Sequence, residues 1–213
     1  MAEHRSTPLP NEFWRAPLRT VRPQDLVDIY AQPRPEVARL VDRGLLHRLA
    51  HGYYVIVPPD YVGRTWLPGL EAAAAGIAAT IYGADRVVVM GISAARLLGA
   101  IPRALATAVV AVPSQHRPIA LTDRSAQVRF VRRDTDALDA EQIRTSLGPA
   151  LVTTPEQTVL DLARRPELGN AEAEVRTAIA TLYHRSDSAR LTQLATEQRL
   201  GVALRRAENW VGA

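Results

Sequence analysis

The chain has 213 residues, enough for one medium-sized domain or two small ones, and its 47% hydrophobic content argues against wholesale disorder. It contains neither cysteine nor lysine, since all 26 basic residues are arginine, and its formal net charge is only +4. Disulfides, thiolate metal sites, a Schiff-base lysine and a P-loop lysine are therefore excluded. No apolar run approaches the roughly 20 residues of a membrane span. The first ten residues, MAEHRSTPLP, lack the apolar centre of a signal peptide, so we expect a cytoplasmic protein with no membrane partner.

Short helices are predicted near the N-terminus. Residues 11–18 could supply one, and another begins at Pro23, because proline is favoured at the first position of a helix. The next helix begins at Pro35 and ends at Gly44, since glycine is common directly after a helix. Its apolar residues recur at helical spacing and form a buried stripe, namely Val37, Leu40 and Val41.

A two-stranded hairpin is predicted to follow these helices. The segments LLHRLA and YYVIVP flank the turn His51-Gly52, and both are typical of antiparallel strands. Alternation along the second strand sends one of Tyr53 and Tyr54 toward the core and leaves the other outside. Two short helices followed by a hairpin is the order of a winged helix-turn-helix. We therefore predict such a domain for residues 1–62.

Residues 63–213 are predicted to form a larger α/β domain that ends in helices, so the fold class of the whole chain is mixed α+β. A linker rich in proline and glycine precedes an alanine-rich helix, LEAAAAGIAATIYG, which should be buried over much of its surface because little of it is polar. Strands are expected in RVVVM, TAVVAVP and AQVRFVRR, and a short helix in SAARLLGA.

The clearest helix start in the chain lies in LVTTPEQTVLDLARR. Thr154 is the predicted N-cap, Pro155 occupies the first helical position, and Gln157 completes a capping box. After Asn170, two or three amphipathic helices are expected, and they end near Trp210.

Basic residues are concentrated on the predicted winged-helix unit in positions that suit DNA binding. A recognition helix enters the major groove of the polyanionic duplex while the hairpin reaches the backbone or minor groove. Arginine can contact both phosphate and guanine. The candidate contacts are Arg34, Arg39 and Arg43 on the helix and His47, Arg48 and His51 on the hairpin. The alternative is a solvated face on a protein-binding winged helix, because Glu36 and Asp42 dilute the charge.

Charge is unevenly distributed in the second half of the chain. Residues 86–133 contain eight arginines and one acid, whereas residues 134–174 contain nine acids and three arginines. Such blocks indicate either docking surfaces or pairing within the molecule. Arg129, Arg132 and Arg133 cluster at the end of a predicted strand. They could form a second phosphate-binding surface, contact the acidic block or bind a partner protein.

Two patterns suggest catalysis or metal binding only weakly. VVVMGISAAR resembles a nucleophile elbow but lacks the second glycine of G-x-S-x-G, so Ser93 is more simply the N-cap of the following helix. His47 and His51 have the spacing of a helical metal site, but HRLAH lacks the glutamate of H-E-x-x-H and lies in the predicted hairpin. We therefore expect no catalytic residue, no cofactor and no metal.

Three blocks together resemble the AbiEi-type antitoxins. RLVDRGLLHRLAHGYYVIVPPD resembles the N-terminal winged helix of that family, GISAARLLGAIP with AVVAVP resembles its next block, and TTPEQTVLDLA resembles a later one. The blocks occur in family order and span most of residues 20–165.

The resemblance implies a two-domain antitoxin without catalytic activity. Its N-terminal domain would repress its own operon by binding double-stranded operator DNA, with contacts from Arg34, Arg39, Arg43 and Arg48. Its C-terminal domain would be associated with neutralising a nucleotidyltransferase-type toxin, for which the family does not require a stable complex. The alternative is a winged-helix transcriptional regulator whose α/β domain senses a ligand, outside any toxin–antitoxin pair.

Overall fold

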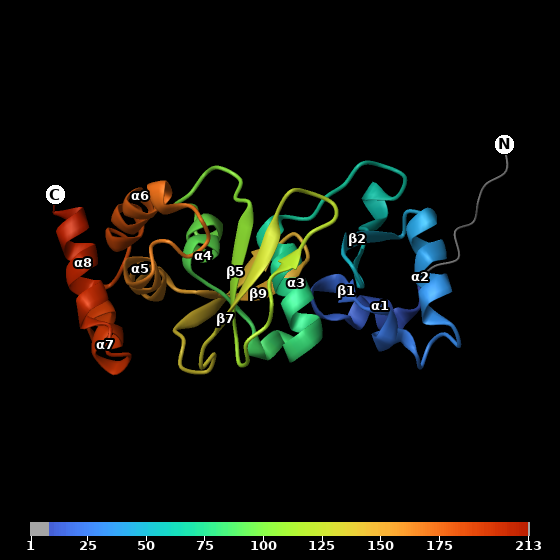
Figure 1. The fold of residues 1–213 in the computed structure, drawn as a ribbon, viewed down its shortest axis with the longest axis horizontal. Coiled ribbons are helices and arrows are strands. Elements are labelled where there is room, and N and C mark those ends of the chain that lie inside the picture. The colour runs from blue at the N-terminus through green and yellow to red at the C-terminus, as the bar shows by residue number, and fades with distance from the viewer. Residues whose placement is uncertain (1–8, 213) are drawn as a thin grey trace.

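The computed structural model describes residues 9–212. A small N-terminal unit, a central sheet and a group of C-terminal helices follow one another along an elongated molecule (Figure 1). Helices and two separate sheets confirm the mixed α+β class. Most of MAEHRSTPLP, the segment judged to lack a signal peptide, lies outside the described residues. Within residues 9–212, no helix is long and apolar enough to cross a membrane.

The N-terminal unit alternates short helices with strands. In chain order it contains α1 (Asn11–Arg15), the 3₁₀ helix η1 (Pro17–Arg19), β1 (Thr20–Val21), the 3₁₀ helix η2 (Pro23–Leu26), α2 (Pro33–Asp42), β2 (Leu46–Ala50) and β3 (Tyr53–Ile56). The three strands form an antiparallel sheet in the order β1-β3-β2. The hairpin predicted around His51-Gly52 is therefore confirmed.

Two helix predictions in this unit need correction. The helix expected at Pro23 does begin there, but it is a 3₁₀ helix of only four residues. The following helix begins at Pro33 rather than at Pro35. Both prolines fit its first turn, because the N–H groups there have no acceptor within the helix and proline has no N–H to leave unpaired.

The end of α2 forms as predicted. Gly44 adopts a positive φ of 69°, which glycine tolerates without steric cost. Its N–H donates to Val41 O at 2.8 Å, and the N–H of Leu45 donates to Leu40 O at 2.9 Å. This pair of bonds is a Schellman motif, which satisfies two carbonyls at the helix end and turns the chain into β2.

The central sheet is mixed, with the strand order β6-β7-β5-β4-β9-β8. Its strands are β4 (Val88–Val89), β5 (Thr107–Val112), β6 (Ile119–Ala120), β7 (Gln127–Arg132), β8 (Ala140–Thr145) and β9 (Gly148–Thr153). β4 pairs in parallel with β9, and β5 pairs in parallel with β7, while the remaining neighbours are antiparallel. All six residues of β5 are buried, which places this strand at the centre of the core.

Helices cover both faces of this sheet (Figure 1). The alanine-rich α3 (Leu70–Tyr82) lies between one face and the N-terminal unit, after the linker helix η3 (Pro59–Tyr61) and before η4 (Ala84–Arg86). α4 (Gly91–Leu97) and α5 (Pro155–Arg164) cover the other face. The prediction of two or three helices after Asn170 is confirmed: they are α6 (Glu172–Tyr183), α7 (Ser188–Glu197) and α8 (Gly201–Val211), which pack against α5.

The predicted start of α5 is correct, although its capping box is only half formed. Pro155 is the first helical residue, and Oγ1 of Thr154 accepts from the N–H of Gln157 at 3.3 Å. The N–H of Thr154 donates instead to Asp139 O at 3.0 Å. Oε1 of Gln157 accepts from the N–H of Asp139 at 3.3 Å. The glutamine therefore joins the helix start to the segment before β8.

The prediction for Ser93 was wrong. α4 begins at Gly91 with Met90 as its N-cap, so Ser93 lies inside the helix. Its side chain is buried, and its Oγ accepts from the N–H of Val109 at 2.8 Å. The hydroxyl therefore satisfies an amide of β5 and is not presented to solvent as a nucleophile would be.

Two hydrophobic cores meet at the hairpin. The smaller core includes Phe13 and Val37 from the helices and Ile56 from β3. The larger core joins the sheet and its helices to Leu49 and Val55 of the same hairpin. The hairpin therefore belongs to both cores, and packing is continuous across the boundary that the sequence suggested between residues 62 and 63.

Candidate nucleic-acid interface

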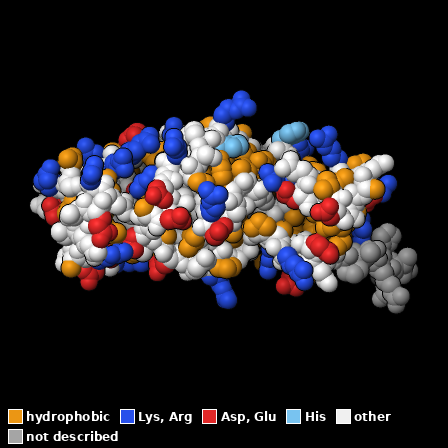
Figure 2. Space-filling model, turned by 90° about the horizontal axis from the view of Figure 1, so that it is seen from below, with side chains coloured by type: hydrophobic (Ala, Val, Ile, Leu, Met, Phe, Trp, Pro, Cys, Tyr) orange, Lys and Arg blue, Asp and Glu red, His pale blue; other side chains and the backbone are white. Residues whose placement is uncertain are grey.

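Arginine side chains are spread over the length of the molecule. Figure 2 shows them over the C-terminal helices at the left end as well as elsewhere along the chain. Positive charge alone therefore does not single out one binding surface. A helix, a hairpin and an open groove occur together around α2, which makes this region the candidate interface.

The three candidate arginines of α2 occupy different sides of the helix. Arg39 is exposed and hydrogen-bonded to Glu36, on the side opposite the buried stripe. Arg34 lies in the first turn and faces the hairpin, whereas Arg43 is the C-cap. Because each residue turns the helix by about 100°, Arg34 and Arg43 lie on opposite flanks. Arg43 lies about 40° from Arg39 around the helix and Arg34 about 140° from it, so a duplex seated on Arg39 would meet Arg43 beside it, whereas Arg34 faces the groove next to the hairpin.

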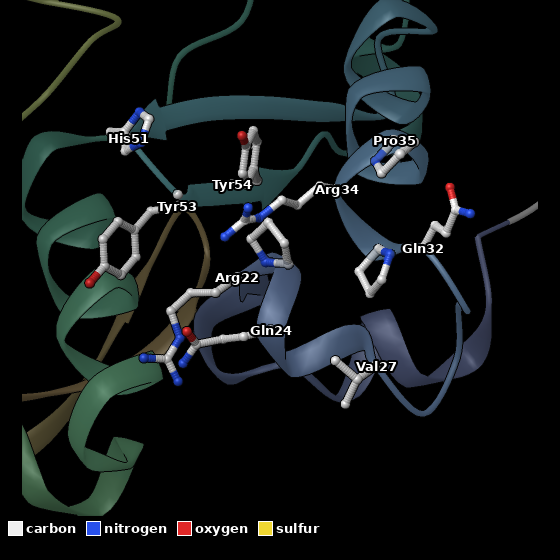
Figure 3. Close-up of a pocket in the computed structure, with 12 residues that line it drawn as sticks. Arg22, Gln24, Val27, Gln32, Arg34, Pro35, His51, Tyr53 and Tyr54 are labelled. Carbon is white, nitrogen blue, oxygen red and sulfur yellow. The ribbon is translucent and has the colours of Figure 1, made fainter.

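An open groove of about 870 Å³ separates the beginning of α2 from the hairpin turn (Figure 3). In this view Arg34 points from α2 toward Tyr54, and Arg22 and Gln24 approach from η2. Arg22 is oriented by Asp25, whose Oδ1 accepts from Nη2 at 2.8 Å. Guanidinium, amide and phenol groups thus line one depression, a combination suited to phosphates and base edges.

Arg48 and His51 lie together near the hairpin turn. Both side chains are exposed, and Nη2 of Arg48 donates to Nδ1 of His51 at 2.8 Å. His47 is placed differently, because successive residues of a strand point to opposite faces. Its Nε2 donates to Oδ2 of Asp123 at 2.9 Å, and its ring meets Trp66 edge-on at a centroid distance of 6.4 Å. His47 therefore contacts the α/β part rather than lying beside Arg48 and His51.

Tyr53 and Tyr54 are both half-buried and both line the groove. Tyr53 packs against the larger core and Tyr54 against the smaller one, so each tyrosine anchors one side of the junction. Burial raises the pKa of the Tyr53 phenol, although the charge of Arg22 and its hydrogen bond act in the opposite direction. The phenol therefore remains a neutral hydrogen-bonding group at physiological pH.

The candidate second basic surface does not form one exposed cluster. Arg129 and Arg132 are three residues apart on β7, so their side chains point to opposite faces of the sheet. Arg133 donates from Nη1 to Oδ1 of Asp161 at 2.9 Å, and only 18% of its side chain is exposed. Of the three, only Arg132 is exposed, whereas Arg129 and Arg133 are partly buried.

The basic and acidic blocks of the sequence meet within the molecule at two ion pairs. Arg133 pairs with Asp161, and Nε of Arg103 lies 2.7 Å from Oε1 of Glu174. Arg133, one of the three arginines of the candidate second surface, thus contacts the acidic block, which was one of the alternatives left open for them.

Asp161 is buried almost completely. Its Oδ1 accepts from Arg133 and from Nε2 of Gln157 at 3.3 Å, while its Oδ2 has no hydrogen-bond partner among the described residues. Burial raises the pKa of this carboxyl, and the charge and hydrogen bond of Arg133 oppose the rise. Arg133 is thus the main group that compensates a buried charge.

His47 and His51, which have the i, i+4 spacing of a helical metal site, have different partners. His47 bonds to Asp123 and His51 to Arg48. In the described part of the chain, no group of three or more His, Cys, Asp or Glu side chains is arranged to hold a metal ion.

Comparison with known families defines the class of this protein as an antitoxin. Residues 87–209 match the family described as the AbiEi antitoxin C-terminal domain. Because the match spans more than half of the chain, the protein belongs to the AbiEi antitoxin family. The second and third sequence blocks lie within the matched region, whereas the first block, residues 39–60, precedes it.

A solved structure has a similar fold. The crystal structure of the RV2827C protein from Mycobacterium tuberculosis superimposes with a TM-score of 0.60 over 97% of this chain and 78% of that chain. The two sequences are 19% identical, so the likeness establishes a shared fold alone. Comparison with curated proteins gives no match.

Proposed function

We propose that this antitoxin counters a nucleotidyltransferase-type toxin and represses its own operon by binding promoter DNA through residues 1–62. Membership of the AbiEi family supports the antitoxin role. The DNA-binding role is supported by one observation above all. The order α1, η1, β1, η2, α2, β2, β3, with the sheet order β1-β3-β2, matches the order expected of a winged helix-turn-helix, and its exposed helix and hairpin carry basic residues.

Each basic residue has a distinct part in this proposal. Arg39 faces outward from α2 toward the major groove, with Arg43 beside it on one flank. Arg34 reaches the DNA strand that enters the groove between α2 and the hairpin. Arg48 and His51 contact the adjacent backbone. His47 is assigned no direct contact, because its ring is bonded to Asp123.

Promoter binding tests the repressor role directly. The purified protein is expected to shift a DNA fragment taken from directly upstream of its own gene, and to bind a shuffled fragment of equal length more weakly. Affinity should fall steeply with salt concentration, because arginine–phosphate contacts release counterions. Equal affinity for both fragments would contradict sequence-specific repression.

Co-expression tests the antitoxin role separately. A nucleotidyltransferase encoded beside this gene should arrest growth when expressed alone, and co-expression of the protein should restore growth. Restoration by residues 63–213 without the N-terminal unit would assign neutralisation to the α/β domain. Promoter binding without any restoration would favour the alternative of a ligand-sensing transcriptional regulator.

A further inference from the structure

The loop between β6 and β7 contacts the outer strand of the hairpin. The N–H of Thr122 donates to Leu49 O at 2.8 Å, and the neighbouring Asp123 accepts from His47. These two bonds join residues more than 70 positions apart in the chain. They connect β2 of the basic hairpin to the domain that matches the antitoxin family.

Asp123 is fixed from both sides. Nε and Nη2 of Arg124 donate to its two carboxylate oxygens at 3.0 and 2.9 Å, and Nη1 of Arg124 donates to Pro68 O at 2.8 Å. Only 3% of the Asp123 side chain is exposed. Burial would raise the pKa of this carboxyl, but the hydrogen bonds from Arg124 and His47 outweigh it and lower the pKa. Asp123 is therefore a charged, immobile acceptor for His47.

The sheet that contains the hairpin is small. β2 is an edge strand of a sheet whose three strands contain only two, four and five residues. A sheet this short has few hydrogen bonds of its own to fix the orientation of its edge strand, so contacts with other elements contribute to that orientation. Leu49 and Val55 supply apolar packing on the larger core, and the Asp123–His47 bond adds a directional contact.

We propose that Asp123 is a positioning residue for DNA binding: it holds the hairpin, through His47, in the orientation that presents Arg48 and His51 to the duplex. This inference rests on the proposed DNA-binding function. It makes operator affinity depend on the antitoxin-family domain, although Asp123 itself touches no DNA. It also replaces the direct DNA contact that the sequence suggested for His47 with an indirect role.

The direction in which DNA affinity changes in one variant distinguishes a positioning role from simple electrostatic repulsion. Removing an acid near a DNA-binding surface should strengthen binding by reducing repulsion of phosphates. If Asp123 positions the hairpin, Asp123→Ala should instead bind the promoter fragment roughly 5- to 30-fold more weakly, the factor that corresponds to about 1–2 kcal/mol. Asp60→Ala, which removes an exposed acid from η3, is the matched control and should leave affinity unchanged or slightly higher. Unchanged or tighter binding by Asp123→Ala would overturn the proposal.

Substitutions of His47 distinguish an indirect role from a direct one. His47→Gln keeps a side-chain N–H that can reach Asp123, whereas His47→Ala removes it. Positioning predicts nearly normal affinity for His47→Gln and a loss like that of Asp123→Ala for His47→Ala. The double variant His47→Ala/Asp123→Ala should lose no more than Asp123→Ala alone, because Asp123→Ala already removes the His47–Asp123 bond. An equal loss in His47→Gln and His47→Ala would show direct contact with DNA and refute the proposal.

Hydrogen exchange provides a readout that requires no DNA. In Asp123→Ala, amides of β2 and β3 and the N–H of Thr122 should exchange faster, while amides of β5 keep their protection. Unchanged exchange in the hairpin would overturn the proposal even if promoter binding by the wild-type protein were confirmed.

Failure of the wild-type protein to bind any promoter fragment would refute both the proposed function and the positioning role. If Asp123→Ala fails to fold, Asp123→Leu replaces it, since it removes both acceptor oxygens while keeping a side chain of similar shape.

Discussion

Replacing Arg133 with alanine is expected to lower the free energy of unfolding by about 3–5 kcal/mol, because it leaves the Asp161 carboxylate buried without its partner. Arg132→Ala provides the matched control. It removes the same side chain one residue earlier, from an exposed position, and should change stability by less than about 0.5 kcal/mol. Denaturant unfolding followed by circular dichroism measures both values.

The loss of unfolding free energy in Arg133→Ala should depend on pH, and the pKa of Asp161 determines the direction of this dependence. Burial already raises the pKa of Asp161, and removing Arg133 removes the main opposing influence. A carboxyl whose pKa is higher in the folded than in the unfolded protein favours folding at low pH and loses that contribution as pH rises above about 4. The deficit relative to wild type should therefore be larger at pH 7 than at pH 5. An equal deficit in Arg132→Ala would contradict the assignment of the buried pair.

The double variant Arg34→Ala/Arg48→Ala is expected to weaken binding of the promoter fragment and of unrelated DNA to about the same extent, because both side chains are proposed to contact the DNA backbone. Arg34 lines the groove beside Tyr54 (Figure 3). Arg48 is exposed on the hairpin. Each lost phosphate contact should also reduce the magnitude of the salt slope by about one. Titration of a labelled fragment at several salt concentrations measures both quantities.

The C-terminal helices provide the control for this double variant. Arg199 and Arg205 are exposed beside or within α8, and Figure 2 shows basic side chains gathered at that end of the molecule. Arg199→Ala/Arg205→Ala removes the same total charge and should change affinity only slightly. Equal losses in the two double variants would indicate binding by net charge alone. The double variant Arg39→Ala/Arg43→Ala tests the exposed side of α2 and the flank opposite Arg34 by the same titration.

Features decided by neighbouring residues were predictable from the sequence. Gly44 ends α2 because the αL conformation there suits glycine, and Thr154-Pro155 begins α5 because cap and first position are read from adjacent residues. The hairpin around His51-Gly52 has the same local origin. The family resemblance drawn from three short blocks was confirmed by the match over residues 87–209.

Features decided by distant residues were not predictable in this way. Ser93 resembles an N-cap locally, but its hydroxyl is engaged by an amide of β5. β8 was missed because it is an edge strand whose only strongly apolar residue is Ile143, so it lacks the alternation of a half-buried strand. The sequence predicts His47 as a basic residue on the DNA-facing side of the hairpin, but in the structure its ring is hydrogen-bonded to Asp123, which is distant in the chain. The blocks of opposite charge likewise indicated that ion pairs could form within the chain, but they did not indicate that Arg133 pairs with Asp161.

Site-directed cleavage of promoter DNA tests the proposed interface most directly. Because the chain contains no cysteine, a single introduced cysteine can carry a chelated-iron cleavage reagent at one chosen position. Reagent at His51→Cys on the hairpin or Ala38→Cys on the exposed side of α2 should cut the promoter fragment at a few adjacent nucleotides. Reagent at Val202→Cys, an exposed position on α8, should not cut. Cleavage from position 202 with none from positions 38 and 51 would contradict DNA binding through α2 and the hairpin.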